Sequence, residues 1–420
     1  MKNLFRRPLV AFAAVALTVS AAAAQQTPPQ PMPKPMPVPH PTVPQMPVPP
    51  PPDVDGQSWV LMDYTTGQII ASKNPDEHRA PASLTKVMTD YVVSSEIAAG
   101  YIHATDMVTI SKQAWEEGGA ATDGSTSFLK EGSQVSVEDL LKGMIVQSGN
   151  DAAIALAQHT AGSQQAFVGL MNTYAKQLGM TDTHYSDVNG YPIADHYSSA
   201  RDIAILTRAL IHNYPTDYAV SKIKKVTLNG ITQPNRNILL WRDPSVDGVK
   251  TGYTAAAGYC MDASAKRGDE RMIAVVMGAS SEHARADSAM ALLNYGFRYY
   301  KTHKLYAAGK PLASPRLWKG EANQLPIGVT QDVMVTVKTG QYDKLKADMD
   351  IPSTLIAPFK KGQKIGTLDI SMNGKPLETV PLVALEDAPQ GGFFKRLWDA
   401  ILLWFHHDSD KSGAKPAGGK

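Results

Sequence analysis

The sequence predicts an α/β domain over residues 53–298, in which helices cover both faces of an antiparallel sheet, and a smaller β-sandwich domain over residues 299–386. Three observations predict this arrangement. The roughly 340 residues that follow the proline-rich start exceed the usual size of one domain. Strand-like segments at both ends of the first part enclose a run of amphipathic helices. After about Tyr300 the pattern changes to short strands spaced by glycine and proline.

Residues 1–24 have the pattern of a secretory signal peptide. Lys2, Arg6 and Arg7 precede an apolar stretch from Leu9 to Val19, and a run of alanines ends at Ala24. The alternative is an N-terminal membrane anchor. It is disfavoured because the apolar core is shorter than the ~20 residues that a membrane span needs. We therefore expect an exported protein.

Residues 25–52 form a proline-rich linker. Nearly every second residue from Pro28 to Pro52 is proline, which excludes a helix or a sheet ladder and favours polyproline II. At ~3.1 Å per residue this segment would extend on the order of 75 Å. We interpret it as a stiff spacer.

The first domain opens with two strands joined by a turn at residues 65–67, and its last two strands turn at residues 267–270. The segments between them have apolar residues at helical spacing, and most begin near serine or aspartate. The expected helices cover residues 83–98, 136–147, 151–161, 163–178, 199–213 and 282–295.

The second domain ends in a predicted hairpin at Asn373-Gly374, and an amphipathic helix follows at residues 390–408. The organised part of this helix, about thirteen residues, is too short to cross a bilayer, so we expect the helix to lie on a membrane surface. The alternative is a helix docked on the β-domain. Residues 409–420 are expected to be disordered. One face of the helix carries Phe394, Leu397, Trp398, Ile401, Trp404 and Phe405, with Lys395 and Asp399 opposite.

Composition excludes several classes of function. Lysine and arginine total 41 against 39 acidic residues, which does not suggest a nucleic-acid partner. The single cysteine, Cys260, excludes an intramolecular disulfide, and its strand-like neighbours predict a buried, inert thiol. The histidines show no metal-ligand spacing, and no glycine-rich phosphate loop is found. We expect neither a metal nor another cofactor.

Ser83 and Lys86 are the first candidates for chemistry. Residues three positions apart share one face of a helix, and a serine at a helix start lies near the positive end of the dipole. A serine hydroxyl needs a neighbour to take its proton, and a desolvated lysine with a lowered pKa can do so. This pair alone is a weak signal, because any amphipathic helix can carry it.

Two further triplets strengthen that signal. Ser148-Gly149-Asn150 lies in the expected link between two helices, and Lys250-Thr251-Gly252 lies where an edge strand is expected. Gly252 in the second triplet lets the backbone of a ligand approach closely. Together with Ser83 and Lys86, these triplets are typical of penicillin-recognising serine acyl-transfer enzymes.

Longer stretches carry a resemblance to one family. The segments "RAPASLTKVMT", "YSSARDIA", "QPNRN" and "VDGVKTGYT", and the long run from Gln134 to Met180, resemble the low-molecular-mass D-alanyl-D-alanine carboxypeptidases of the penicillin-binding protein 5 and 6 type, peptidase family S11. The resemblance runs from about Ser58 to the C-terminus. It implies a serine β-lactamase/DD-peptidase-like fold and removal of the terminal D-alanine from peptidoglycan pentapeptides. It also implies inhibition by β-lactams and a place on the periplasmic face of the inner membrane.

The resemblance implies a role for each matching position. Ser83 would attack the carbonyl between two D-alanines, and the backbone N–H groups of Ser83 and Tyr253 would hold the oxyanion. Lys86 would accept the proton of Ser83. Ser148 and Lys250 would pass the proton to the departing D-alanine. Which of the two lysines is the base stays open.

The remaining matching positions concern substrate binding. Asn150 would bind the peptide amide, while Thr251, beside Gly252, and a guanidinium would hold the terminal carboxylate. Arg285 and Arg236 are the candidates for that guanidinium, with solvated surface charge as the alternative for each. Asp195 matches an acidic residue beside the pocket, and a helix-capping carboxylate is the alternative.

Three rival functions remain at this point. A β-lactamase would turn over penicillin, but the stretch from Asp187 to His196 holds no glutamate for a deacylating water, so inhibition is favoured. An endopeptidase would release cross-linked partners instead of D-alanine. A wall-binding shape factor would bind no penicillin at Ser83.

Overall fold

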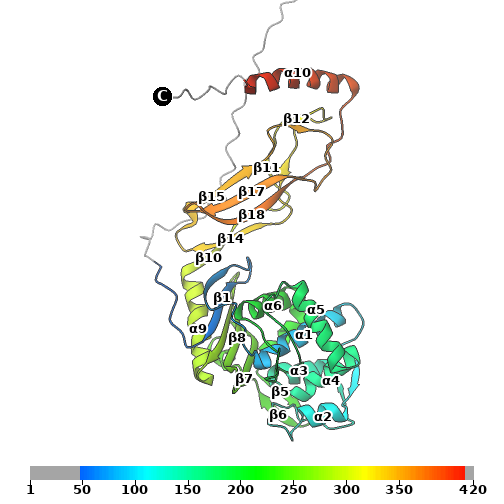
Figure 1. Ribbon diagram of the computed structural model, residues 1–420, viewed down its shortest axis with the longest axis vertical. Coiled ribbons are helices and arrows are strands. Elements are labelled where there is room, and N and C mark those ends of the chain that lie inside the picture. Colours follow the sequence, from blue (N-terminus) through cyan, green and yellow to red (C-terminus); the bar gives the residue numbers. More distant parts are fainter. Residues whose placement is uncertain (1–47, 412–420) are drawn as a thin grey trace, which may run out of the picture.

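The computed structural model describes residues 48–411, with side chains as far as Trp404. The predicted signal peptide, most of the proline-rich linker and most of the predicted C-terminal tail lie outside these residues. Figure 1 shows two folded parts. The earlier residues of the chain build the larger part, and the later residues build the smaller, β-rich part. A helix follows at the end of the β-rich part that is farther from the larger one.

The larger part consists of strands from both of its ends around a helical middle. Its helices are η1 (Ala82–Leu84), α1 (Thr85–Ala98), α2 (Lys112–Gly118), α3 (Val137–Val146), α4 (Asn150–Ala161), α5 (Gln164–Gln177), α6 (Ala200–Asn213), α7 (Pro215–Tyr218), η2 (Ala219–Lys222), α8 (Leu239–Arg242) and α9 (Glu282–Tyr299). Its strands are β1 (Ser58–Asp63), β2 (Ile69–Lys73), β3 (Met107–Thr109), β4 (Gln134–Ser136), β5 (Lys225–Leu228), β6 (Ile231–Pro234), β7 (Val246–Thr254), β8 (Gly258–Arg267) and β9 (Glu270–Ala279).

The central sheet is antiparallel, with strand order β2-β1-β9-β8-β7, so β7 forms one edge. Both faces are covered, because successive side chains of a strand point to opposite sides. On β9, Ala274 and Val276 belong to the core beneath α9, whereas Ile273 and Val275 belong to the core beneath the helical middle. This confirms the predicted fold class.

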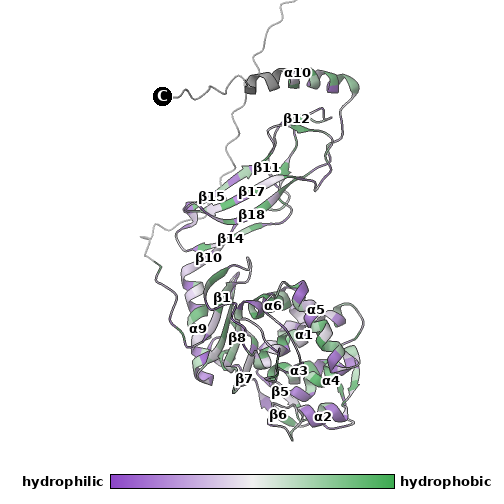
Figure 2. Ribbon diagram, in the orientation of Figure 1, coloured by the Kyte–Doolittle hydropathy of each residue, from purple (hydrophilic) through white to green (hydrophobic). Residues whose placement is uncertain are grey.

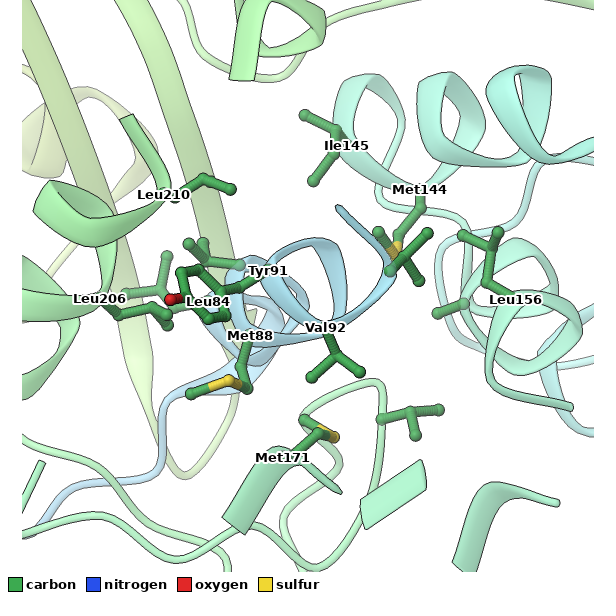
Figure 3. Close-up of a cluster of buried hydrophobic side chains, with 14 of the residues drawn as sticks. Leu84, Met88, Tyr91, Val92, Met144, Ile145, Leu156, Met171, Leu206 and Leu210 are labelled. Carbon is green, nitrogen blue, oxygen red and sulfur yellow. The ribbon is translucent and has the colours of Figure 1, made fainter. Parts of the chain in front are cut away.

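Helix α1 runs through the middle of the helical core and carries the residues that follow Ser83. Leu84, Met88 and Val92 are completely buried, and Figure 3 shows them among side chains from α3, α4, α5 and α6. Burying one such side chain contributes about 1.5–3 kcal/mol. The start of α1 is therefore fixed by packing on every side.

The smaller part is built from short strands around a core of its own. Its elements are β10 (Tyr300–Tyr306), β11 (Pro311–Ala313), β12 (Leu317–Trp318), β13 (Ile327–Gly328), β14 (Val333–Lys338), η3 (Tyr342–Lys344), β15 (Leu345–Asp350), β16 (Leu355–Ile356), β17 (Lys364–Met372) and β18 (Lys375–Ala384). One sheet has the order β11-β13-β18-β17-β15, while β10 pairs with β14 and β12 with β16.

Polar contacts join the two parts close to the point where α9 passes into β10. Thr302 Oγ1 donates to Asp63 Oδ2 at 3.0 Å, and the Thr66 and Thr336 hydroxyls lie 2.9 Å apart. The hydrophobic cores of the two parts share no residue.

Helix α10 (Phe393–Lys411) packs on the smaller part through its polar side. Asp399 is only 1% exposed, and its carboxylate accepts from the Lys319 backbone N–H at 2.7 Å and from Lys395 Nζ at 3.1 Å. Phe394 and Trp398, on the other side, are exposed. Figure 2 shows hydrophobic and hydrophilic residues mixed along the helix. Within residues 48–411, no helix is both long and apolar enough to span a membrane.

Most local expectations agree with the structure, but the short helices α2, α7 and α8 were not predicted and some helix ends differ. Cys260 lies buried on β8, and the Ser136 hydroxyl caps α3 by accepting from the Asp139 N–H at 3.2 Å. The last helix of the first domain was predicted to end at Tyr295 but continues to Tyr299, because Tyr295 and Tyr300 both pack into the core beneath it.

Candidate active site

Three segments that are far apart in the sequence meet at one groove of about 720 Å³. They are the start of α1, the link between α3 and α4, and the edge strand β7. Two loops complete the wall, one from residues 122–125 and one from residues 189–191. The groove is lined by Ser83, Ser148, Asn150, Thr251, Gly252, Tyr253, Arg236 and Arg285, all predicted from the sequence.

Ser83 lies in the 3₁₀ turn η1, and its neighbours hold it there tightly. Ala82 has a left-handed backbone with φ of 48°, a conformation that non-glycine residues adopt at a cost. A Cβ on Gly190 would lie 1.8 Å from the Ala82 carbonyl oxygen, and one on Gly252 would lie 3.2 Å from the Ser83 nitrogen. Glycine at these two positions therefore lets a loop and β7 close around the serine.

Lys86 is completely buried behind Ser83. Its Nζ donates to Ser83 Oγ at 3.1 Å, to Asn150 Oδ1 at 2.7 Å and to the Asn189 carbonyl at 2.9 Å. Burial lowers its pKa from the usual range to about 7, against the opposing charge of Asp187. A lysine in this state exchanges its proton near neutral pH.

Ser148 lies in the short link between α3 and α4, and Asn150 follows at its end. Asn150 is the first residue of α4, so its carboxamide points from the helix start toward Lys86. Ser148 has a left-handed backbone with φ of 72°. Its buried Oγ has no hydrogen-bond partner within the described residues. A buried hydroxyl of this kind is available to a ligand.

Lys250 lies on β7 beside the groove and is also buried. Its Nζ donates to the carbonyl of Thr251 at 3.0 Å. Burial lowers its pKa well below the usual range, and the positive charges of Lys86, Arg236 and Arg285 lower it further. The predicted triplet lies in the middle of the edge strand, not at its start as expected, because β7 begins at Val246.

The two arginines occupy different environments. Arg285 is 4% exposed, so the surface-charge alternative is wrong for it. Its Nη1 donates to the Gly252 carbonyl at 3.0 Å, and its guanidinium faces the ring of Tyr259. Arg236 is exposed and lines the groove. Arg236 Nη2 donates to the carboxamide oxygen of Gln147 at 3.1 Å when that oxygen faces the arginine.

Asp195 does not line the groove, and it does not cap a helix either. The following helix, α6, is capped by the Ser199 hydroxyl, which accepts from the Asp202 N–H at 3.1 Å. The helix-capping alternative is therefore wrong, because the chain turns once more before α6 begins.

Asp187, Asn189 and Tyr191 are site residues that sequence reasoning missed. The Asp187 carboxylate accepts from the backbone N–H groups of Gly190 at 2.7 Å and Tyr191 at 3.0 Å. This turn presents the Asn189 carbonyl to Lys86. The aspartate three residues before a glycine was the one available signal, because this pattern is typical of a side-chain-stabilised turn.

A sequence profile described as D-alanyl-D-alanine carboxypeptidase, Peptidase S11, matches residues 45–281, more than half of the chain. The chain belongs to this family. The penicillin-binding protein 5 C-terminal domain profile matches residues 300–390 of this carboxypeptidase. The chain is 48% identical to the D-alanyl-D-alanine carboxypeptidase DacC of Escherichia coli (strain K12), over 84% of its own length and 89% of that protein. It is 44% identical to DacA of the same strain over similar shares, 84% and 89%.

Solved structures agree with this assignment. Penicillin-binding protein 5 from Haemophilus influenzae aligns with a TM-score of 0.78 at 41% identity, over 81% of this carboxypeptidase and 99% of that chain. Penicillin-binding protein 6B from Escherichia coli aligns with a TM-score of 0.67 at 40% identity, over 80% and 98%. The predicted family, activity and two-domain fold are thereby confirmed.

Proposed function

We propose that Ser83 is the nucleophile with which this carboxypeptidase removes the terminal D-alanine from peptidoglycan pentapeptides. Its Oγ forms an ester with the carbonyl carbon of the fourth residue while the bond to the nitrogen of the last D-alanine breaks. The proton of Ser83 ends on that nitrogen, and free D-alanine leaves. Water then hydrolyses the ester and restores the serine.

One observation carries this proposal: buried Lys86 lies 3.1 Å from Ser83 Oγ and has a pKa of about 7. A neutral amine has two N–H donors and one lone pair. Two of its three neighbours, Asn150 Oδ1 and the Asn189 carbonyl, can only accept hydrogen bonds. The lone pair must therefore face the Ser83 hydroxyl, which favours Lys86 as the base over Lys250.

The oxyanion and the leaving group are served by the other two segments. The closeness of Gly252 to the Ser83 nitrogen supports an oxyanion hole made of the Ser83 and Tyr253 backbone N–H groups. The unpartnered Ser148 hydroxyl would relay the proton to the departing amine, together with buried Lys250. Asn150 would hold the amide carbonyl of the substrate.

A substrate that ends in a carboxylate suits the charge of the groove. Burial lowers the pKa of Lys250, and Lys86, Arg236 and Arg285 lie close enough for their positive charges to lower it further. We propose that Thr251 and Arg285, with Arg236 at the rim, bind this carboxylate. Such binding distinguishes a carboxypeptidase from an endopeptidase, whose substrates continue past the cleaved bond.

This carboxypeptidase is acylated and inhibited by β-lactams, as is standard for its family. We propose Ser83 as the acylated residue. The stretch from Asp187 to His196 lines one side of the groove through Asn189, Gly190 and Tyr191 and has no glutamate to activate a water. The acyl group would therefore leave slowly.

The proposal is tested by incubating the purified enzyme with a pentapeptide muropeptide and measuring free D-alanine. Wild type should release it, and Ser83→Ala should not. A fluorescent penicillin should label the wild type but not the variant. Release of a cross-linked partner without D-alanine would contradict the carboxypeptidase assignment of the site.

We also propose that the protein is exported and that α10 attaches it to the outer surface of the inner membrane. Two observations support the attachment. The buried Asp399 pins the polar side of α10 to the β-rich part, and the aromatic side faces solvent. An apolar helical face of this kind suits insertion to headgroup depth.

A further inference from the structure

Tyr191 places a hydroxyl in the groove that the reaction described above does not use. Tyr191 is 36% exposed and lines the groove. Asn150 Nδ2 donates to Tyr191 Oη at 2.9 Å, and Tyr191 Oη donates to the Glu117 carbonyl at 3.3 Å. The hydroxyl therefore links Asn150 to the end of α2.

The direction of these two bonds fixes the orientation of Asn150. A carbonyl can only accept, so the single proton of the Tyr191 hydroxyl goes to Glu117. The hydroxyl must then accept from Asn150, which requires the NH₂ end of the carboxamide on that side. The oxygen end consequently faces Lys86. The carboxamide is held at both ends.

The tyrosine itself is held by its backbone. Its N–H donates to Asp187 Oδ2 at 3.0 Å, within the same turn that presents the Asn189 carbonyl to Lys86. The ring thus spans from this turn across to α2, over Asn150. One N–H of the Asn150 NH₂ group bonds Tyr191, and the other is left for the groove.

We propose that Tyr191 is a positioning residue that holds Asn150 so that its second N–H binds the carbonyl of the acyl-side amide of a substrate. This inference rests on the proposed function, in which Ser83 is acylated. The proposed mechanism gives Tyr191 no role at the reacting carbonyl or at the leaving group. Its loss should therefore weaken ligands that carry such an amide more than ligands that lack one.

Two penicillins separate these cases. Benzylpenicillin carries an acylamino side chain, whereas 6-aminopenicillanic acid has the same ring system and carboxylate but a bare amine. The experiment measures the second-order rate constant of Ser83 acylation by each compound. In Tyr191→Phe the constant for benzylpenicillin should fall about 3- to 10-fold more than that for 6-aminopenicillanic acid, the range expected for one hydrogen bond.

Two further variants make the experiment sharper. Tyr191→Leu, which removes both hydroxyl and ring, should show the same selective loss. Tyr101→Phe removes a hydroxyl from a tyrosine that is 78% exposed and lies outside the groove, and it should change neither constant. A thermal melt of each variant checks that it folds.

The outcomes are distinct. An equal loss for both penicillins, or no loss for either, would overturn the role of Tyr191 and leave Ser83 acylation intact. Failure of the wild type to be acylated by either compound would overturn the proposed function itself, and the role of Tyr191 with it.

Discussion

The most informative single residue is Lys86, whose pKa of about 7 makes its protonation state a reporter of the mechanism. If its neutral form takes the proton of Ser83, acylation by penicillin should slow roughly tenfold per pH unit below about pH 7 and level off above it. The measurement is the second-order acylation constant between about pH 5 and pH 9. A constant independent of pH across this range would exclude Lys86 as the base.

Asp90, one helical turn beyond Lys86, gives a prediction about stability. It is buried, its Oδ2 has no partner within the described residues, and burial raises its pKa to about 8. An unfolded aspartate titrates near pH 4, so the folded state holds a proton that the unfolded state has lost. Stability from this group is fully present below about pH 4 and is lost as pH rises through about 8.

Asp90→Asn should therefore raise the free energy of unfolding at pH 8 by on the order of 2 kcal/mol, or roughly 4–8 °C in melting temperature. It should also flatten the pH dependence. Asp269→Asn, at an exposed turn, serves as the control. Identical pH slopes for Asp90→Asn and wild type would show that Asp90 is ionised in the folded protein.

Among single residues, the sequence predicted those that belong to a motif. It missed the residues that hold the motif side chains in place. Ser83, Asn150 and Lys250 stand in patterns that recur with fixed chemistry. Tyr191 reaches Asn150 through a hydrogen bond made across 41 positions, and no local pattern predicts which tyrosine will reach which amide. Asp399 was expected on the polar face of its helix, but its burial depends on the distant Lys319 backbone.

At the scale of elements, α10 offers a matched pair of substitutions. Leu397 on this helix is 51% exposed, and Leu377 on β18 is 40% exposed. If α10 inserts into a lipid surface, Leu397→Glu should weaken binding to anionic lipid vesicles at least about tenfold, because the burial of a leucine side chain is lost. Leu377→Glu should not.

Vesicle co-sedimentation of the two variants measures the difference. Equal binding by both, or no binding by the wild type, would contradict attachment through α10.

Elements were predictable where periodicity was strong and boundaries were marked. Most serine-capped helices begin as expected, because a side-chain cap leaves a local signature, as at Ser136. Helix α2, capped by Ser111, was not predicted. The end of α9 was not predictable, because tertiary packing of Tyr295 and Tyr300 extends it beyond the point where the sequence pattern weakens. The order of strands in the sheet also depends on contacts between distant segments.

At the scale of the whole molecule, the two separate cores predict two unfolding units. Few polar contacts join them, among them the salt bridge between Lys301 and Glu270 at 3.1 Å. The groove that contains Ser83 is lined only by residues of the larger unit. Differential scanning calorimetry should therefore show two transitions, of which only one moves to higher temperature after acylation. A single transition that moves as a whole would show that the parts unfold together.

The position of β7 at the edge of the sheet has a consequence for solubility. An unpaired strand edge recruits other strands and invites self-association, and proteins usually protect such edges with charge or bulk. Here η1 and η2 pack against part of β7, and Arg236, Arg285 and Tyr253 line the groove beside it. The open part of the edge is therefore flanked by side chains that also line the groove, and an engineered groove stripped of its arginines would gain a tendency to form intermolecular sheets.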